Sequence, residues 1–147
     1  MTNTKKTKGF TLIEILVVVA LIAILAAVTI VAINPAKNFA DTRNAQRSSD
    51  VKAILDAVTQ YLATAGNTLG GLGTIPACSS TPAAIGTGSG NVNLAGTLVS
   101  DYIAAIPIDP SGGTAANTGY TICTTASNRI QIAAPNAENG KTVSVQR

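Results

Sequence analysis

The chain has 147 residues, of which 12% are charged and 3% aromatic, and it contains no histidine. Its formal net charge of +3 comes from three lysines within residues 1–9, because from Phe10 onward basic and acidic side chains are equal in number. This balance argues against nucleic-acid binding through overall positive charge, and the lack of histidine removes the commonest general base and metal ligand. The length limits the chain to one small domain beside any membrane segment.

Residues 1–9 are a short basic segment that ends at Gly9 and precedes a long apolar run. The run from Phe10 to Ile33 has 24 residues and contains one charged side chain, Glu14. As a helix it extends roughly 36 Å, more than the roughly 30 Å hydrocarbon core of a bilayer. A carboxylate in a membrane segment costs about 2.5–3.5 kcal/mol on insertion scales, so we expect Glu14 to have a partner and a function.

The order of these features resembles the N-terminus of type IV prepilins and of the related pseudopilins of type II secretion. The shared pattern is a basic leader, Gly9, then Phe10-Thr11-Leu12-Ile13-Glu14 and an apolar helix. The resemblance implies that a membrane prepilin peptidase cuts after Gly9, removes residues 1–9 and methylates the new amine of Phe10. It also implies that Glu14 serves in filament assembly.

A physical argument for pairing Phe10 with Glu14 stands beside this resemblance. Cleavage creates a cation on Phe10, and a neighbouring copy offers Glu14 at a similar depth, so pairing offsets the cost of both charges in an apolar filament core. The contact joins two different surfaces and is heterologous, which generates an open helix of subunits if the rotation does not close. The alternative is a signal anchor with one tolerated polar residue, which explains neither the leader nor the position of Glu14.

A second helical segment is expected over residues 34–66. Pro35 either kinks a continuous helix or begins a new one with Asn34 as its N-cap, and both alternatives are open. Gly66 and Asn67 are expected to end the segment. Apolar residues at helical spacing predict a stripe that packs on the globular part of the chain. The stripe consists of Val51, Ile54, Leu55, Val58 and Leu62.

The polar faces of this second helix carry a local basic cluster of Arg43, Arg47 and Lys52. We interpret the cluster as a solvated face. The alternative is pairing between subunits of a filament, with acids such as Asp41 and Asp50. Lys52 and Asp56 are four residues apart and are spaced for an ion pair on the helix surface.

Residues 67–147 are expected to form a globular head that begins with a loop. The stretch up to Leu94 is rich in glycine, proline, serine and threonine, and its glycines lack the Gly-Lys-Ser/Thr sequence of a phosphate-binding loop. A short helical turn is predicted over Leu98–Ile103. Asp109 is interpreted as a turn residue rather than a calcium ligand, because no spaced set of oxygen ligands surrounds it. Related pseudopilins usually carry a bulky aromatic residue where this chain has Ser111.

The C-terminal part alternates apolar and polar residues in three segments, 120–124, 129–133 and 142–145, with turns at 127–128 and 139–140. We therefore predict an α+β, pilin-like fold: a long N-terminal helical spine, transmembrane in its first half and amphipathic in its second, packed on a small antiparallel sheet of three to four strands. The residues expected to cover the helix stripe are Tyr120, Ile122, Ile130, Ile132, Val143 and Val145.

The two cysteines, Cys78 and Cys123, lie well beyond the apolar run. If that part of the chain is outside the cytoplasm, a disulfide is favoured over a zinc site, because no histidine is present. The bond closes a long loop and stabilises the head by roughly 2–4 kcal/mol. In the predicted sheet Cys123 points away from the core, towards the loop that holds Cys78.

No catalytic constellation is present, so we expect no enzyme, and no cofactor, metal or specific nucleic-acid site is predicted. The leading hypothesis is a structural subunit of a type IV pilus, a single-pass protein of the inner membrane that later polymerises with itself into a surface filament. The resemblance implies a prepilin peptidase and an assembly ATPase and platform as partners. The alternatives are a pseudopilin of a type II secretion or competence system and a membrane-anchored binding module that never polymerises.

Overall fold

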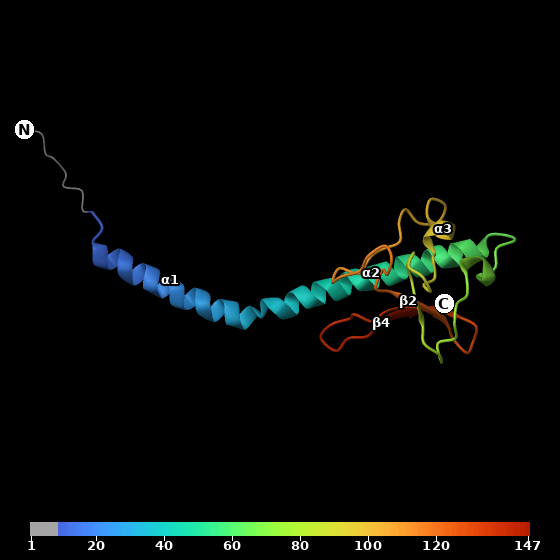
Figure 1. The fold of residues 1–147 in the computed structure, drawn as a ribbon. Coiled ribbons are helices and arrows are strands. Elements are labelled where there is room, and N and C mark those ends of the chain that lie inside the picture. Colours follow the sequence, from blue (N-terminus) through green and yellow to red (C-terminus); the bar gives the residue numbers. More distant parts are fainter. Residues whose placement is uncertain (1–8) are drawn as a thin grey trace, which may run out of the picture. The chain divides into compact units, whose positions relative to one another are not determined.

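The computed structural model describes residues 9–147, which fall into two compact units that meet between Asn38 and Phe39. The basic residues 1–8 of the expected leader lie outside the described residues. Figure 1 shows the elements in chain order. Each unit is described by itself below.

The first unit is built around helix α1, which runs from Leu12 to Ile33. Thr11 is its N-cap: the Thr11 hydroxyl accepts a hydrogen bond from the backbone N–H of Glu14, and the Glu14 carboxylate accepts one from the backbone N–H of Thr11. This reciprocal capping box satisfies two backbone donors that no helical partner could reach. None of the α1 side chains is buried, and the helical stretch Leu12–Ala63 contains a window long and apolar enough to cross a membrane.

Helix α1 stops at Asn34, and helix α2 (Pro35–Ala63) begins at the next residue. Asn34 has φ 46° and ψ 72°, a left-handed conformation that ends α1. Its side-chain oxygen accepts a hydrogen bond from the backbone N–H of Lys37 at 3.3 Å, so Asn34 also caps α2. Of the two alternatives left open by the sequence, Pro35 therefore begins a new helix.

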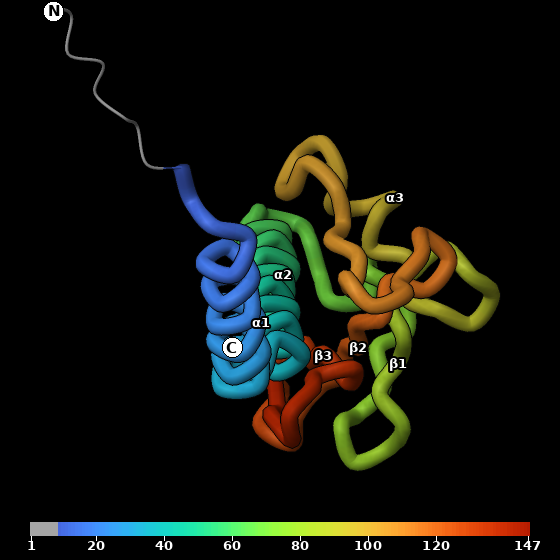
Figure 2. The backbone as a smooth tube through the Cα atoms, turned by 90° about the vertical axis from the view of Figure 1, so that its left-hand side faces the viewer, coloured from blue at the N-terminus to red at the C-terminus, as the bar shows by residue number. Residues whose placement is uncertain are grey.

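The second unit contains a four-stranded antiparallel sheet in the order β1-β2-β3-β4, against which α2 packs (Figure 2). Its register places Ile122 opposite Ile132 and Ile132 opposite Val145, which forms an apolar row across three strands. The strands are β1 (Ala83–Ala84), β2 (Thr121–Thr124), β3 (Ile130–Ala134) and β4 (Val143–Gln146). The connections add a 3₁₀ helix, η1 (Leu69–Leu72), and a one-turn helix, α3 (Ala95–Leu98).

One hydrophobic core joins α2 to the sheet and the loops. The predicted helix stripe is confirmed: Val51, Ile54, Leu55 and Val58 are buried, and Leu62 packs against the cluster partly buried. The predicted inner face of the sheet is confirmed as well, with Val145 partly buried and the other five residues buried. Residues of the long connections complete the core, namely Leu72, Ile85, Val92, Leu94 and Leu98.

Some element boundaries differ from the predictions. Helix α2 ends at Ala63 rather than at residue 66, because Thr64 donates to the carbonyl of Tyr61 in a tightened last turn. The helical turn of the head covers Ala95–Leu98 rather than residues 98–103, since the chain becomes extended at Val99. A fourth strand, β1, lies inside the segment predicted as loop.

Candidate functional site

The N-terminal site begins with two residues ahead of α1. Phe10 is 86% exposed, the highest value among the large apolar side chains that the structure describes. A Cβ added at Gly9 would meet no atom within 4 Å, and the backbone there is not in the left-handed region. Nothing in the packing of the described residues therefore requires glycine at this position.

Glu14 lies in the first turn of α1, and among the described residues Thr11 supplies the hydrogen bonds that its side chain accepts. Its Oε2 accepts from the Thr11 backbone N–H at 2.7 Å and from the Thr11 hydroxyl at 2.8 Å. Its Oε1 accepts no hydrogen bond from the residues that the structure describes, and no ion pair with a described cation involves it. Both donors are neutral, so within residues 9–147 the carboxylate charge has no opposite charge beside it.

The surface of α1 around Glu14 is apolar on every side. Its large side chains are exposed, for example Leu12 at 85% and Val31 at 81%. Such a surface is stable only in lipid or against other apolar helices. Small residues along the helix permit the close approach of neighbouring helices. They are Ala20, Ala23, Ala26 and Ala27.

A second polar arrangement lies in the head, where Arg47 of α2 is completely buried. Its Nε and Nη2 donate to the two carboxylate oxygens of Asp109, at 2.7 and 3.2 Å. Its Nη1 donates to Asn44 at 3.0 Å and to Glu138 at 2.9 Å, and its Nη2 also donates to the hydroxyl of Ser111. These five bonds use every N–H of the guanidinium group. The prediction of a solvated face was therefore wrong for Arg47.

Asp109 is buried and faces Arg47 from the loop before β2. Its carboxylate also accepts from the backbone N–H and the hydroxyl of Ser111, at 2.9 and 2.7 Å. Burial acts to raise the pKa of Asp109, but the bonds from Arg47 and Ser111 outweigh it and hold the pKa below its usual value. The hydrogen bond to Asp109 raises the pKa of Arg47, so both groups stay charged. Ser111 thus supplies two of the hydrogen bonds that hold the Asp109 carboxylate.

Further hydrogen bonds connect the Arg47–Asp109 pair to Glu138, in the segment between β3 and β4. Arg43 binds Glu138 through two bonds of 2.7 and 2.6 Å, and this fork, with the bond from Arg47, lowers the pKa of Glu138 to about 2. The Asn44 amide exchanges two hydrogen bonds with the backbone of Glu138, both at 2.9 Å. Arg43 is therefore paired within its own chain, but its side chain stays 35% exposed, so the predicted solvated face holds for it in part.

Two acidic residues of α2, Asp50 and Asp56, also have partners in the same chain. Asp50, named as an alternative partner between subunits, accepts from the buried hydroxyl of Tyr120 at 2.6 Å, and burial raises the pKa of Tyr120. Asp56 forms an ion pair with Arg147 at 3.7 Å rather than with Lys52. Of the predicted basic cluster, Lys52 alone is exposed.

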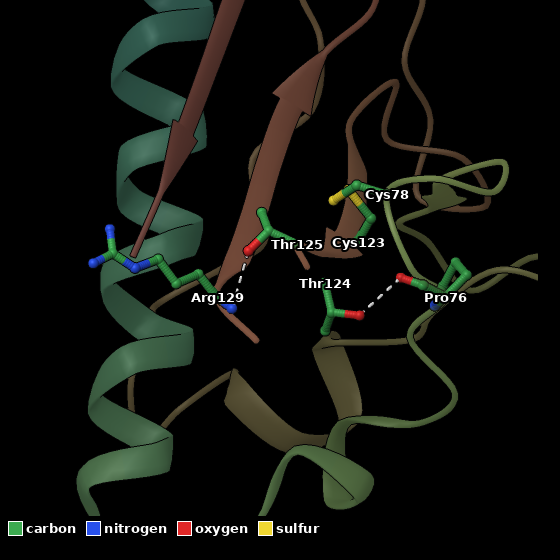
Figure 3. The surroundings of a disulfide bond; sticks show 6 residues. All are labelled: Pro76, Cys78, Cys123, Thr124, Thr125 and Arg129. Carbon is green, nitrogen blue, oxygen red and sulfur yellow. Dashed lines mark hydrogen bonds between the residues drawn. A yellow bond between two sulfur atoms is a disulfide. The ribbon is translucent and has the colours of Figure 1, made fainter. Parts of the chain in front are cut away.

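Cys78 and Cys123 form a disulfide that fastens the long loop to β2 (Figure 3). The loop also pairs with Thr124, whose backbone N–H donates to the carbonyl of Pro76 at 2.8 Å and whose carbonyl accepts from Cys78 at 2.7 Å. Cys123 is buried outside the hydrophobic core cluster, on the face of the sheet away from the stripe of α2. Among the described residues, no group of three or more histidine, cysteine, aspartate or glutamate side chains could hold a metal ion.

An apolar N-terminal helix, with a second helix packed on a small antiparallel four-stranded sheet, is a pilin-like α+β arrangement. A family model described as the prokaryotic N-terminal methylation motif matches residues 4–30, which is the prepilin motif of type IV pilins and pseudopilins. A search of curated proteins and a search of solved structures gave no match.

The motif supports the pilin and pseudopilin family in general and points to a structural subunit rather than an enzyme. It implies processing by a prepilin peptidase and assembly of a pilus-type structure. Together with the apolar helix α1, it fits anchoring in the membrane before assembly.

Proposed function

We propose that this chain is a structural subunit of a type IV pilus, which polymerises into a helical surface filament after removal of its leader. The observation that carries the proposal is Glu14, a single carboxylate that has no opposite charge beside it within residues 9–147. It lies within the prepilin motif and on an exposed apolar helix. A lone charge in such a segment is expensive in lipid unless it has a partner and a purpose.

Cleavage between Gly9 and Phe10 is the first step of the proposed function. Glycine at position 9 is not required by the packing of residues 9–147, which fits a requirement imposed by an external peptidase. The cut removes the basic leader and leaves a new amine on Phe10, the site of the proposed N-methylation. Phe10 is exposed and lies just before the N-cap of α1, so this amine is accessible to the enzyme.

Assembly then pairs the amine of Phe10 in one subunit with Glu14 in a neighbour. The capping box leaves Oε1 of Glu14 available, so the carboxylate can accept a cation without releasing Thr11. The two partners lie on different surfaces of the subunit, which supports a heterologous contact and an open helical polymer. The exposed face of α1 exchanges lipid for the helices of neighbouring subunits, with an assembly ATPase and platform supplying the work.

The test is mass spectrometry of the N-terminal peptide, taken from sheared surface material and from membranes of the same cells. A chain that begins at methylated Phe10 in the sheared fraction supports a surface pilin. The same processed chain confined to membranes contradicts the pilus and favours a pseudopilin. An uncut N-terminus in both fractions contradicts both and leaves a membrane anchor.

A further inference from the structure

We propose that the turn Asn139-Gly140 is a site of spontaneous covalent modification, at which Asn139 converts to aspartate and isoaspartate through a cyclic imide. The sequence contains one Asn-Gly pair, and it lies in the connection between β3 and β4. This site is independent of the proposed filament function, because it depends on the geometry of the head alone.

The turn presents the reacting atoms to solvent. Asn139 has φ 57° and Gly140 has φ 67°, and the backbone N–H of Lys141 donates to the carbonyl of Glu138 at 3.1 Å, as in a type I′ turn. Both central residues are exposed. The N–H of Gly140 donates no hydrogen bond to any residue that the structure describes, and a Cβ at Gly140 would meet nothing within 4 Å. Base in the solvent can therefore remove the proton from this nitrogen.

The reaction needs water and no other reactant. The deprotonated nitrogen of Gly140 attacks Cγ of Asn139, a bond forms between them, and the bond from Cγ to Nδ2 breaks, with Nδ2 leaving as ammonia after it takes a proton from water. Glycine has no Cβ to hinder this approach. Water then opens the ring: addition at Cγ gives aspartate, and addition at the main-chain carbonyl gives isoaspartate.

The chain contains its own comparison at the other hairpin turn. Asn128 has φ 59°, almost the same as Asn139. It is followed by Arg129, whose backbone N–H donates to the hydroxyl of Thr125 at 3.1 Å (Figure 3). The backbone nitrogen of Arg129 is held in this hydrogen bond, and the long Arg129 side chain hinders its approach to Cγ of Asn128. We therefore expect Asn128 to remain an amide under conditions that convert Asn139.

Conversion changes the contact between the turn and α2. The Asn139 amide donates to Oδ1 of Asp41 at 3.1 Å, and the ammonium group of Lys141 donates to the same oxygen at 2.8 Å. A carboxylate at position 139 replaces a donor with a like charge beside Asp41, which is repulsive. Isoaspartate also lengthens the main chain of the turn by one atom, so the type I′ geometry beside Glu138 is lost.

The test incubates the full chain, purified in detergent micelles, in mildly alkaline and in mildly acidic buffer. Peptide mapping by mass spectrometry and enzymatic methylation of isoaspartate follow each asparagine, with Gly140→Ala as the variant that slows the reaction. We expect conversion at Asn139, faster in alkaline buffer and ahead of Asn128. An intact Asn139, or equal conversion at the two positions, overturns the proposed site.

The consequence is tested separately by Asn139→Asp, which introduces the new charge without lengthening the main chain. We expect its thermal midpoint to lie below that of the unmodified chain, and that of incubated, isoaspartate-containing protein to lie lower still. Unchanged midpoints in both samples overturn the proposed loosening of the turn.

Discussion

Replacing Arg47 with methionine tests most directly how much the buried ion pair between Arg47 and Asp109 stabilises the head. The substitution removes five hydrogen bonds and leaves the carboxylate of Asp109 buried with Ser111 as its one remaining donor among the described residues. Removing one partner of a buried ion pair costs about 3–5 kcal/mol. For a unit of this size, such a loss lowers the melting temperature by more than about 10 °C.

The assay is near-ultraviolet circular dichroism of the full chain in detergent during thermal unfolding. All three tyrosines, Tyr61, Tyr102 and Tyr120, lie in the unit from Phe39 to Arg147, so the tyrosine signal follows the unfolding of that unit. The signal of the apolar helix α1, which has no tyrosine, does not interfere.

Two further variants show whether the loss comes from the ion pair. Lys52→Met changes an exposed basic residue of the same helix, and we expect its effect to stay within about 0.5 kcal/mol. Combining Arg47→Met with Asp109→Leu removes both charges, and we expect the double variant to be more stable than Arg47→Met alone. A loss below about 1 kcal/mol for Arg47→Met, as for a surface pair, would refute the reasoning.

Two other predictions concern Glu14 and the acidic side of the stability profile. Glu14→Ala should insert in the membrane normally but fail to enter filaments, as measured by comparing membrane and sheared fractions; normal filaments would contradict the assigned role. The pKa of Glu138 is lowered to about 2 and that of Asp109 is also lowered, so both groups contribute stability that is fully present above their unfolded values of about 4. The melting temperature should therefore be level near neutral pH and fall below about pH 4. In Arg47→Met the fall should be less steep, because Asp109 loses the bonds from Arg47 that lower its pKa. An equally steep fall in that variant would contradict this explanation.

The sequence predicted the parts of the fold that repeat regularly. The apolar stripe of α2 and the alternation in β2, β3 and β4 each report which side of an element is buried, so the core between them followed from spacing. The two-residue strand β1 and the core residues Leu72 and Ile85 were not predicted. They lie in short irregular connections, whose apolar residues do not recur at a regular spacing. Their burial depends on the loop being fastened to β2, which is a contact over a long sequence distance.

The burial of Arg47 and its pairing with Asp109 were not predicted, although the sequence contained one sign of that burial. Arg47 lies four residues before Val51, in line with the buried stripe of α2, and its spacing alone placed it on the inner face. A charge at such a position requires a partner. The identity of that partner, Asp109, 62 residues further along the chain, could not be read from spacing.

The N-terminal motif, by contrast, could be recognised from the sequence because its residues are adjacent along the chain. A basic segment, a glycine, an aromatic residue and one acid at fixed spacing need no folded structure to be recognised, and the family model matches residues 4–30. The capping box between Thr11 and Glu14 was not predicted, although a threonine followed three residues later by glutamate is its known signature.

The exposed face of α1 also has a consequence for how a filament gains and loses subunits. Fifteen large apolar side chains of this helix are exposed in the single chain, and their transfer into water costs on the order of 20 kcal/mol or more. This approaches the strongest non-covalent affinities known, so a subunit has no measurable concentration in water. In the proposed filament, subunits therefore cannot leave from the distal tip into the medium. Single subunits are therefore expected to leave the proposed filament at its base, where each departing helix passes directly into lipid.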